Sequence, residues 1–327
     1  QAEVIALAEK LNAPVTSLRG GRGIVPADHP LAMSTYAARQ LWPETDLVIG
    51  IGSRLEMIYM RWTSMTTLVN KPEAPPHLIR IDIDPEEMER LVPHVGLLAD
   101  AKAGAAALTE ALDQAGTPVA KDLTRLDRAR DTAKQAIAAV QPHVGFLEAI
   151  RRALPREALF AEELTQAGYA SFLAWDVFAP RTYITSGFQG NLGYGFMTSL
   201  GAKIGRPNAP VLSVTGDGGF LYGASELSTA VKEKIALITV LFNNGAYGNV
   251  RRDQQTVFEG RTIASDFVNP DFELMAKAYG VTYAKATNAD ELEAAITAAL
   301  PNTGPTLIEV PVDLATEVNP WPYIVKR

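Results

Sequence analysis

The feature that most constrains the fold is a strand–helix–strand pattern in the second half of the chain. Val211–Thr215 predicts a buried strand that ends at Gly216, and Ala236–Phe242 predicts a second one that ends at Asn243 and Asn244. A helix is expected between these two strands. Short apolar runs that alternate with helices are typical of parallel sheets with crossover connections. The chain is therefore predicted to have an α/β fold.

The same alternation extends over the whole chain and predicts two tandem domains, each with a parallel sheet flanked by helices. Its 327 residues are enough for two domains, which we expect over residues 1–115 and 142–327. The linker between them, residues 116–141, is charged and poor in large apolar residues. It indicates an exposed helical connection, and an ordinary surface helix of either domain is the alternative. Further strands are expected at Ala13–Thr16, Asp46–Ile51, His77–Ile83, Val95–Leu98, Leu159–Ala161, Arg181–Ile184 and Thr306–Val310, and helices at Gln1–Leu11, Ala101–Ala115, Lys121–Gln135, Ser225–Glu233, Phe272–Tyr279 and Ala289–Leu300.

Composition excludes several classes of function. The net charge of −7 argues against a nucleic-acid partner, whose phosphates require a basic face. The absence of cysteine excludes disulfides, thiolate zinc sites and a cysteine nucleophile. No apolar run approaches the roughly 20 residues that span a bilayer, so no membrane partner is expected. These observations favour a cytoplasmic enzyme that acts on a small molecule.

Polar residues follow the two strongest predicted strands. Gly216, Asp217, Gly218 and Gly219 follow the first strand, and Asn244 follows the second, 27 residues after Asp217. Ligands of open parallel sheets bind at the carboxyl ends of the strands, where the strand order switches. A carboxylate, an amide oxygen and backbone carbonyls suit Mg²⁺, which commonly binds phosphates as well. Glycines let backbone N–H groups approach those phosphates, and the positive end of the next helix, expected near Ser225, adds to the attraction.

The residues alone therefore predict a magnesium–diphosphate site. Taken singly, each of the two motifs has a simpler interpretation as a tight turn after a strand. Their occurrence at the ends of consecutive buried strands favours the binding site over two unrelated turns.

The pair formed by GDGGF (216–220) and NN (243–244) resembles the magnesium-diphosphate motif of thiamine-diphosphate-dependent enzymes, which begins with GDG and ends with NN. Gly187–Gly205 resembles the glycine-rich segment that precedes GDG in acetolactate synthases and 2-oxo-acid decarboxylases, with Met197 where the family usually has Pro. The first half also carries similar stretches: Arg22-Gly23 through His29-Pro30, with Arg in place of Lys, Asp46–Arg54 and Ile81–Pro85. The resemblance implies that residues 1–115 are the family's middle, Rossmann-like domain and residues 142–327 its thiamine-diphosphate/Mg-binding domain.

The resemblance also implies the ligands of the metal and of the diphosphate. Asp217 and Asn244 would hold Mg²⁺ through their side chains, and Ala246 through its backbone carbonyl. Gly216, Gly218 and Gly219 form the diphosphate loop, in which the last two would donate their N–H groups. Gln166, after the first strand of this domain, is expected to reach the diphosphate as well.

For the other half of the cofactor, the resemblance points to the glycine-rich segment. Leu192 matches the bulky apolar residue that props the cofactor into its bent shape, and a plain core leucine is the alternative. The Gly190 carbonyl and the Leu192 N–H would contact the pyrimidine ring. Tyr247 and Gln189 are candidates for the substrate side of the site.

One part of the family's machinery has no counterpart among these residues. The family's N-terminal domain carries the glutamate that activates the cofactor, and this chain offers no candidate for it, so we expect no catalytic residue within the chain. The predicted helix starts at Gln1 with no strand before it. We therefore expect a middle domain without its first strand, a fragment of a longer enzyme, and little turnover by the isolated chain. The resemblance implies a homodimer or homotetramer, with the missing domain supplied by the same or another chain.

The remaining polar residues are assigned structural roles. The four histidines, His29, His77, His94 and His143, are expected to lie in the middle domain or the linker, away from the GDG edge, and their spacing fits no zinc site. Arg54, Asp82 and Asp84 lie at predicted strand ends of the middle domain. That domain binds FAD in acetolactate synthases, so FAD is possible, but turn and helix-cap roles for these residues are the alternative.

The leading hypothesis is therefore a thiamine-diphosphate- and Mg²⁺-dependent enzyme that acts on a 2-oxo acid by acetolactate-synthase-like decarboxylation or carboligation. A simple decarboxylase or a 2-hydroxyacyl lyase of the same family is the first alternative. A non-catalytic cofactor-binding subunit is the second. Intact GDGG and NN motifs argue against a degenerate metal site.

Overall fold

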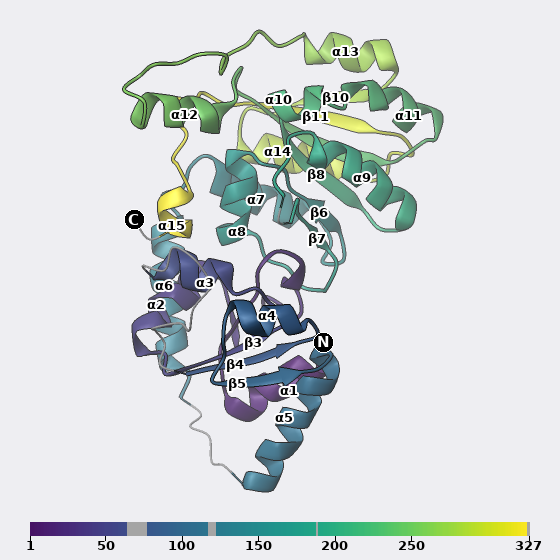
Figure 1. Cartoon of the computed structure of the whole chain (residues 1–327). Helices are drawn as coiled ribbons and strands as arrows, with labels where there is room; N and C mark the ends of the chain where they lie inside the picture. The colour runs from purple at the N-terminus through teal and green to yellow at the C-terminus, as the bar shows by residue number, and fades with distance from the viewer. Residues whose placement is uncertain (64–76, 117–121, 188, 326–327) are drawn as a thin grey trace. The chain divides into compact units, whose positions relative to one another are not determined.

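The computed structural model describes residues 1–63, 77–116, 122–187 and 189–325 (Figure 1). The chain divides into two compact units, Gln1–Ala136 with Trp321–Arg327, and Ile137–Pro320. The division falls inside the predicted linker, near the end of helix α6 (Thr124–Ile137). Residues 117–121 of that linker, and Phe188 of the glycine-rich segment, lie outside the described residues.

The described residues of unit 1 form two small parallel sheets. Strands β3, β4 and β5 form one sheet in that order, and β1 pairs with β2 in the other. Its elements are α1 (Ala2–Leu11), β1 (Val15–Thr16), η1 (Arg19–Gly21), β2 (Ala32–Met33), α2 (Thr35–Leu41), η2 (Trp42–Glu44), β3 (Leu47–Ile51), α3 (Glu56–Trp62), β4 (His77–Asp82), α4 (Pro85–Arg90), β5 (Val95–Leu98), α5 (Ala101–Ala115), α6, and α15 (Trp321–Ile324).

Local chemistry explains where the helices of unit 1 begin and end. The Asp84 carboxylate caps α4 by accepting the Glu86 N–H at 2.9 Å, and Pro85 occupies the first helical position. Asp100 caps α5 in the same way, and Gly116 ends that helix in the left-handed region (φ 62°). Helix α6 lies within the predicted linker, and all of it except its last residue belongs to unit 1.

Unit 2 is built on one six-stranded, fully parallel sheet with the strand order β10-β11-β9-β8-β6-β7. Its elements are α7 (His143–Ala153), β6 (Leu159–Ala161), α8 (Gln166–Ala174), β7 (Tyr183–Ile184), α9 (Tyr194–Gly205), β8 (Val211–Gly216), α10 (Asp217–Leu221), η3 (Ala224–Glu226), α11 (Leu227–Lys232), β9 (Leu237–Asn243), α12 (Gly248–Thr256), α13 (Phe272–Tyr279), β10 (Thr282–Lys285), α14 (Ala289–Ala299) and β11 (Thr306–Pro311).

The strand order of unit 2 reverses between β6 and β8. From β6 the chain first adds β7 on one side and then returns across β6 to add β8 on the other. Helices α9, α11 and α13 cover one face of the sheet around a core that includes Phe196, Phe220 and Phe272 (Figure 1). Helices α7, α8 and α14 pack against one another. The reversal marks a crevice at the carboxyl ends of β6 and β8, the usual ligand position in such sheets.

The predicted α/β class with parallel sheets is confirmed, and each predicted strand overlaps an observed one. The helix predicted at Ser225–Glu233 corresponds to η3 followed by α11. The short helix α10, which already starts at Asp217, was not predicted. Strand β10 was not predicted, because Thr282–Lys285 is a half-exposed edge strand without an apolar run. Across the described ranges no helix is long and apolar enough to cross a membrane.

Candidate functional site

The carboxylate of Asp217 joins the two sequence motifs at the carboxyl edge of unit 2. It lies at the first position of α10 and is 2% exposed. Its Oδ1 accepts the Gly218 N–H at 2.8 Å. Its Oδ2 accepts the N–H groups of Asn244 at 3.1 Å and Gly245 at 2.7 Å. The expected proximity of Asp217 and Asn244 is therefore observed, and it is made through the backbone of the second motif.

A third segment also binds this carboxylate. The Asn269 Nδ2 atom, in the segment before α13, donates to Asp217 Oδ2 and to Asn243 Oδ1, both at 2.7 Å. Its Oδ1 is buried without a hydrogen-bond partner among the described residues. Asn269 thus holds the ends of β8 and β9 together.

The Asn244 side chain is held from two sides. Its Oδ1 accepts the Ala246 N–H at 3.2 Å, and its Nδ2 donates to Glu317 Oε1 at 3.2 Å. Ala246 is buried and forms an antiparallel bridge with Asp266. The carboxylate of Asp217, the amide of Asn244 and the backbone at Ala246 therefore lie next to one another at the carboxyl edge of the sheet.

The Asp217 carboxylate is buried, and its contacts are with neutral groups. Within the described ranges no Lys, Arg or His pairs with it. Burial raises the pKa of Asp217, while hydrogen bonds from Asn269 and from backbone N–H groups lower it. A buried carboxylate without a cationic partner is costly. A hard divalent cation would remove this cost, and oxygen donors are the ligands that Mg²⁺ prefers, so the site fits that ion.

The glycines of the first motif allow close packing that any side chain would prevent. A Cβ at Gly218 would lie 2.5 Å from the Tyr247 ring, and one at Gly219 would lie 2.6 Å from Glu163 Oε1. A Cβ at Gly216, directly before α10, would lie 3.1 Å from the Thr165 methyl carbon. Glycine at these three positions therefore lets the side chains of Thr165, Tyr247 and Glu163 pack directly against the backbone of the GDGG motif.

The glycine-rich segment before α9 reaches α10. A Cβ at Gly193 (φ 83°) would lie 2.9 Å from Tyr222 Cβ and 3.7 Å from the Gly219 carbonyl oxygen. Gly190 packs on Leu164, whose Cδ1 would lie 2.7 Å from a Cβ at Gly190. Leu192 keeps 38% of its surface exposed, so the alternative of a core leucine is wrong for the described residues.

Gln166 begins α8 and is 4% exposed. Its Nε2 donates to Asn249 Oδ1 of α12 at 3.3 Å. Its Oε1 has no hydrogen-bond partner in the part of the chain that the structure describes. A buried amide oxygen of this kind can still accept a hydrogen bond, so it suits the neighbourhood of a bound polar group.

Tyr247 lies directly before α12, with its ring 5.0 Å from that of Phe267 in an edge-on arrangement. A hydrogen bond with Tyr222 raises the pKa of Tyr247, and burial raises it further. Gln189, the other candidate for the substrate side, is exposed.

Three polar residues of this region were missed in the sequence. Glu163 lies under the glycine loop, Asn269 holds Asp217, and Glu317 holds Asn244. Glu163 could have been found in the sequence, because Glu162 and Glu163 directly follow a buried strand. A carboxylate at that position lies at the carboxyl edge of the sheet, where ligands bind. Asn269 and Glu317 lie in irregular segments, and their spacing in the sequence carries no such signal.

The expectation that all histidines lie away from the GDG edge was wrong for His143. This residue begins α7 of unit 2, and its side chain is 1% exposed. Its Nε2 lies 3.3 Å from Glu317 Oε1, the same oxygen that accepts Asn244 Nδ2. His29 pairs with Glu9 at 3.2 Å in unit 1, and His77 contacts His94 edge-on at 5.2 Å.

The candidate residues of unit 1 have turn, cap and ion-pair roles. Asp84 caps α4, and Asp82 Oδ1 accepts the Asp84 N–H at 3.1 Å. Arg54 pairs with Glu56 at 3.0 Å and with Glu87 at 3.2 Å. The turn and cap alternative is thus confirmed for the two aspartates.

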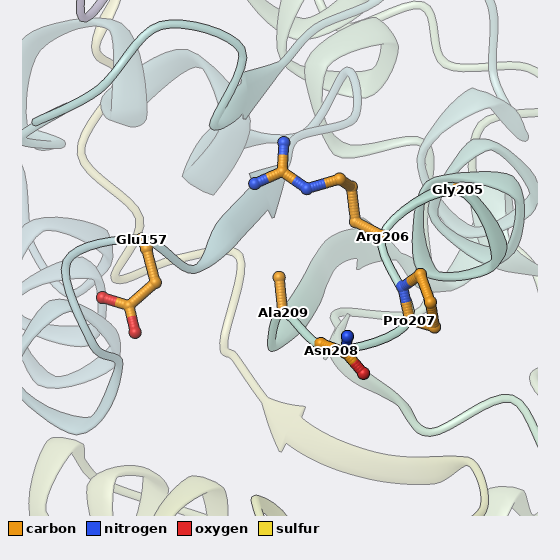
Figure 2. A pocket seen from close by; sticks show the side chains of 6 residues that line it. All are labelled: Glu157, Gly205, Arg206, Pro207, Asn208 and Ala209. Carbon is orange, nitrogen blue, oxygen red and sulfur yellow. The ribbon is translucent and has the colours of Figure 1, made fainter.

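A surface hollow of about 340 Å³ lies at the opposite edge of the unit 2 sheet (Figure 2). Its lining residues, Glu157 and Gly205–Ala209, directly precede β6 and β8. In parallel sheets this is the amino edge. The hollow is therefore remote from Asp217 and does not contribute to the candidate site.

Comparison with known proteins gives two family matches and a set of relatives. Residues 1–112 match the central domain of thiamine pyrophosphate enzymes, and residues 166–310 match their C-terminal, thiamine pyrophosphate-binding domain. The chain is 34% identical to a probable 2-ketoarginine decarboxylase of Pseudomonas aeruginosa over 312 residues, 93% of this chain and 54% of that protein. It is 31% identical to the acetolactate synthase isozyme 2 large subunit of Escherichia coli over 337 residues, 98% of this chain and 59% of that protein. The chain thus spans somewhat more than half the length of these curated relatives.

Proposed function

Because this chain belongs to the thiamine pyrophosphate enzyme family, we propose that it acts in the thiamine-diphosphate- and Mg²⁺-dependent conversion of a 2-oxo acid. The observation that carries the proposal is the buried Asp217 carboxylate, which binds the backbone of the second motif and has no cationic side-chain partner among the described residues. One relative is named for decarboxylation of 2-ketoarginine, itself a 2-oxo acid, and another for acetolactate synthesis. Both names support this reaction class.

In this proposal the metal and the diphosphate are held at the edge of unit 2. Asp217 and Asn244 would hold Mg²⁺ through side-chain oxygens, and Ala246 through its carbonyl. Gly218 and Gly219 would donate N–H groups to the diphosphate, from a backbone that Gly216 keeps accessible. Gln166 Oε1, buried and without a partner among the described residues, belongs to the same proposed environment.

The segment before α9 would bind the other end of the cofactor. The exposed Leu192 side chain would support the bent cofactor, while the Leu192 N–H and the Gly190 carbonyl meet its pyrimidine ring. When bound, thiamine diphosphate supplies the nucleophilic carbon and the electron sink for decarboxylation. The residues of this chain bind, orient and shield it from water, and we assign them no proton transfer. Tyr247 and Gln189 remain the proposed substrate-side residues.

Calorimetric titration with thiamine diphosphate, with and without Mg²⁺, tests the proposal. We expect binding that requires Mg²⁺ and is abolished by Asp217→Ala, because the main charged ligand is lost. Asp290→Ala, at an exposed position in the first turn of α14, is the matched control and should bind normally. Unchanged affinity in Asp217→Ala, or no binding to the unaltered protein, would contradict the proposed site.

Release of CO₂ from a panel of 2-oxo acids separates the enzymatic proposal from a non-catalytic cofactor-binding subunit. Analysis of the organic product then distinguishes carboligation, simple decarboxylation and cleavage of a 2-hydroxyacyl compound. Cofactor binding without turnover in the assembled protein favours the non-catalytic subunit.

We also propose that the protein works as a homodimer or homotetramer in the cytoplasm, because the resemblance implies a cofactor site completed by another domain or subunit. Light scattering coupled to size exclusion, with and without cofactor, tests the assembly. A monomer under both conditions would contradict it.

A further inference from the structure

Glu163 is a buried carboxylate at the point where the strand order of unit 2 reverses. It lies two residues beyond β6, next to β8, and is 0% exposed. Open parallel sheets bind their ligands in this crevice. A carboxylate is an expensive group to bury there, so its contacts need an explanation.

The contacts of Glu163 come from both sides of the crevice. On one side its Oε1 accepts the Gly193 N–H, and the N–H groups of Tyr194 and Gly195 at the start of α9 also donate to the carboxylate. On the other side its Oε2 accepts the hydroxyl of Thr215, the residue before Gly216. One side chain therefore links the start of α9 to the end of β8, directly before the 216–219 segment.

Packing fixes this carboxylate in place. A Cβ at Gly219 would lie 2.6 Å from Oε1 and 2.8 Å from Oε2, and a Cβ at Gly195 would lie 2.8 Å from Glu163 Cβ. Both glycines are needed where they stand because the Glu163 side chain fills the space between them. Neither loop can shift relative to the other without breaking a contact with Glu163.

Overall stability does not explain why this charge lies in the interior of the fold. Within the described residues no cationic side chain pairs with Glu163, and burial raises its pKa while the hydrogen bonds lower it. Buried polar groups of this kind are retained in some proteins because they specify one arrangement of the surrounding segments. The segments here are the two that the proposed function assigns to opposite ends of the cofactor.

We propose that Glu163 is a positioning residue that sets the distance between the diphosphate loop, 216–219, and the pyrimidine-side segment, 189–193. The inference rests on the proposed function. The affinity for a ligand that contacts both segments should depend on Glu163, whereas the affinity for a ligand that contacts only the diphosphate loop should not. Thiamine diphosphate and inorganic pyrophosphate, each with Mg²⁺, are these two ligands.

The test is a pair of calorimetric titrations on the unaltered protein, Glu163→Ala and Glu163→Gln. We expect Glu163→Ala to weaken thiamine diphosphate binding by about 10- to 100-fold, the usual effect of losing a residue that orients ligand-binding groups. Pyrophosphate affinity should stay within about twofold. Glu163→Gln should recover most of the cofactor affinity. Its amide oxygen still accepts the Gly193 N–H, and its amide N–H can donate to the Thr215 hydroxyl oxygen, which then accepts instead of donating.

Two controls separate this role from loss of stability. Leu292→Ala removes a fully buried side chain of α14 and should lower stability by about 2–5 kcal/mol without altering the ratio of the two affinities. Thr215→Val should reproduce part of the Glu163→Ala effect and add little to it in the double variant.

Each outcome is decisive. Equal losses of cofactor and pyrophosphate affinity in Glu163→Ala, or no loss of either, would overturn the inference. Absence of cofactor binding by the unaltered protein would contradict the proposed function instead, and so the two failures are distinguishable.

Discussion

Glu317 Oε1 accepts the side-chain N–H of Asn244 at 3.2 Å, and this contact fixes which way the Asn244 amide faces. With Nδ2 directed to Glu317, Oδ1 lies on the side of the turn that carries the Ala246 backbone. The Glu317 side chain is 1% exposed and has two cationic or potentially cationic neighbours, His143 at 3.3 Å and Arg252 at 3.5 Å. A residue from the segment after β11 thus orients a proposed metal ligand at the end of β9.

We predict that Glu317→Ala weakens Mg²⁺ binding in the presence of thiamine diphosphate by about 10- to 100-fold, because the Asn244 amide loses its orientation. Glu317→Gln should retain most of the affinity, since its carbonyl oxygen can still accept from Asn244. Glu293→Ala, which removes a surface carboxylate paired with Arg152, is the control. Titration calorimetry provides the measurement, and equal affinities of Glu317→Ala and the control would disprove the orienting role.

Asn269→Ala is expected to lower the free energy of unfolding by about 1.5–3 kcal/mol, the typical contribution of a hydrogen bond to a charged group. The variant loses the donor that Asn269 gives to Asp217 and the one it gives to Asn243. Asn208→Ala, at an exposed position in the hollow of Figure 2, is the control and should change stability little. Urea denaturation measures both. A loss no larger in Asn269→Ala than in Asn208→Ala would rule out this role.

The sequence predicted that the GDGG and NN motifs meet, because the apolar strands that precede both motifs are strong local signals. Buried strands β8 and β9 are short apolar runs, and the polar residues that follow them must meet at one sheet edge. The contact between Asp217 and the second motif therefore needed no knowledge of the rest of the chain. Even the exposure of Leu192 agrees with its position between two glycines, outside any apolar run.

The residues that hydrogen bond to Asp217 and Asn244 from other segments could not be predicted in the same way. Asn269 and Glu317 lie in segments far along the chain, and only the tertiary fold brings them to Asp217 and Asn244. His143 shows the same limit, since its role depends on Glu317 and not on its own neighbours in sequence. A histidine without a local motif was therefore misplaced.

The buried ion-pair cluster of unit 1 predicts a pH-dependent stability. Glu87 pairs with buried Arg80 at 3.2 Å and with Arg90 at 2.6 Å. Burial raises the pKa of Glu87, but hydrogen bonds from Arg90 and Arg80 outweigh this effect and the pKa is lowered. A carboxyl group with a lower pKa in the folded state stabilises the fold above its unfolded pKa, and this contribution disappears as the pH falls through the folded pKa.

Glu87→Gln should therefore be less stable than the unaltered protein at pH 7, with a stability difference that shrinks as the pH falls below about 4. Urea denaturation between pH 7 and pH 3 checks this. Glu110→Gln, at an exposed position on α5, should show no such convergence. A difference that stays constant over the whole range would show that Glu87 stabilises unit 1 by packing and not by charge.

Gly219 and Gly201 are both glycines of short helices in unit 2, yet alanine should have opposite effects at the two positions. A Cβ at Gly219 would lie 2.6 Å from Glu163 Oε1, whereas one at Gly201, inside α9, meets no atom within 4 Å. Gly219→Ala should cost about 1–3 kcal/mol of stability through overpacking. Gly201→Ala should gain about 0.5–1 kcal/mol, because alanine loses less conformational freedom than glycine in a helix.

The Glu163 carboxylate is the cause of the first effect, so its removal should relieve the clash. In Glu163→Ala the added substitution Gly219→Ala is expected to cost less than in the unaltered protein, and the double-variant cycle should show coupling of at least about 0.5 kcal/mol. Thermal and urea unfolding of the four proteins measure that coupling. Strict additivity would mean that Gly219 is required by the backbone of α10 alone, and that the carboxylate below it adapts freely.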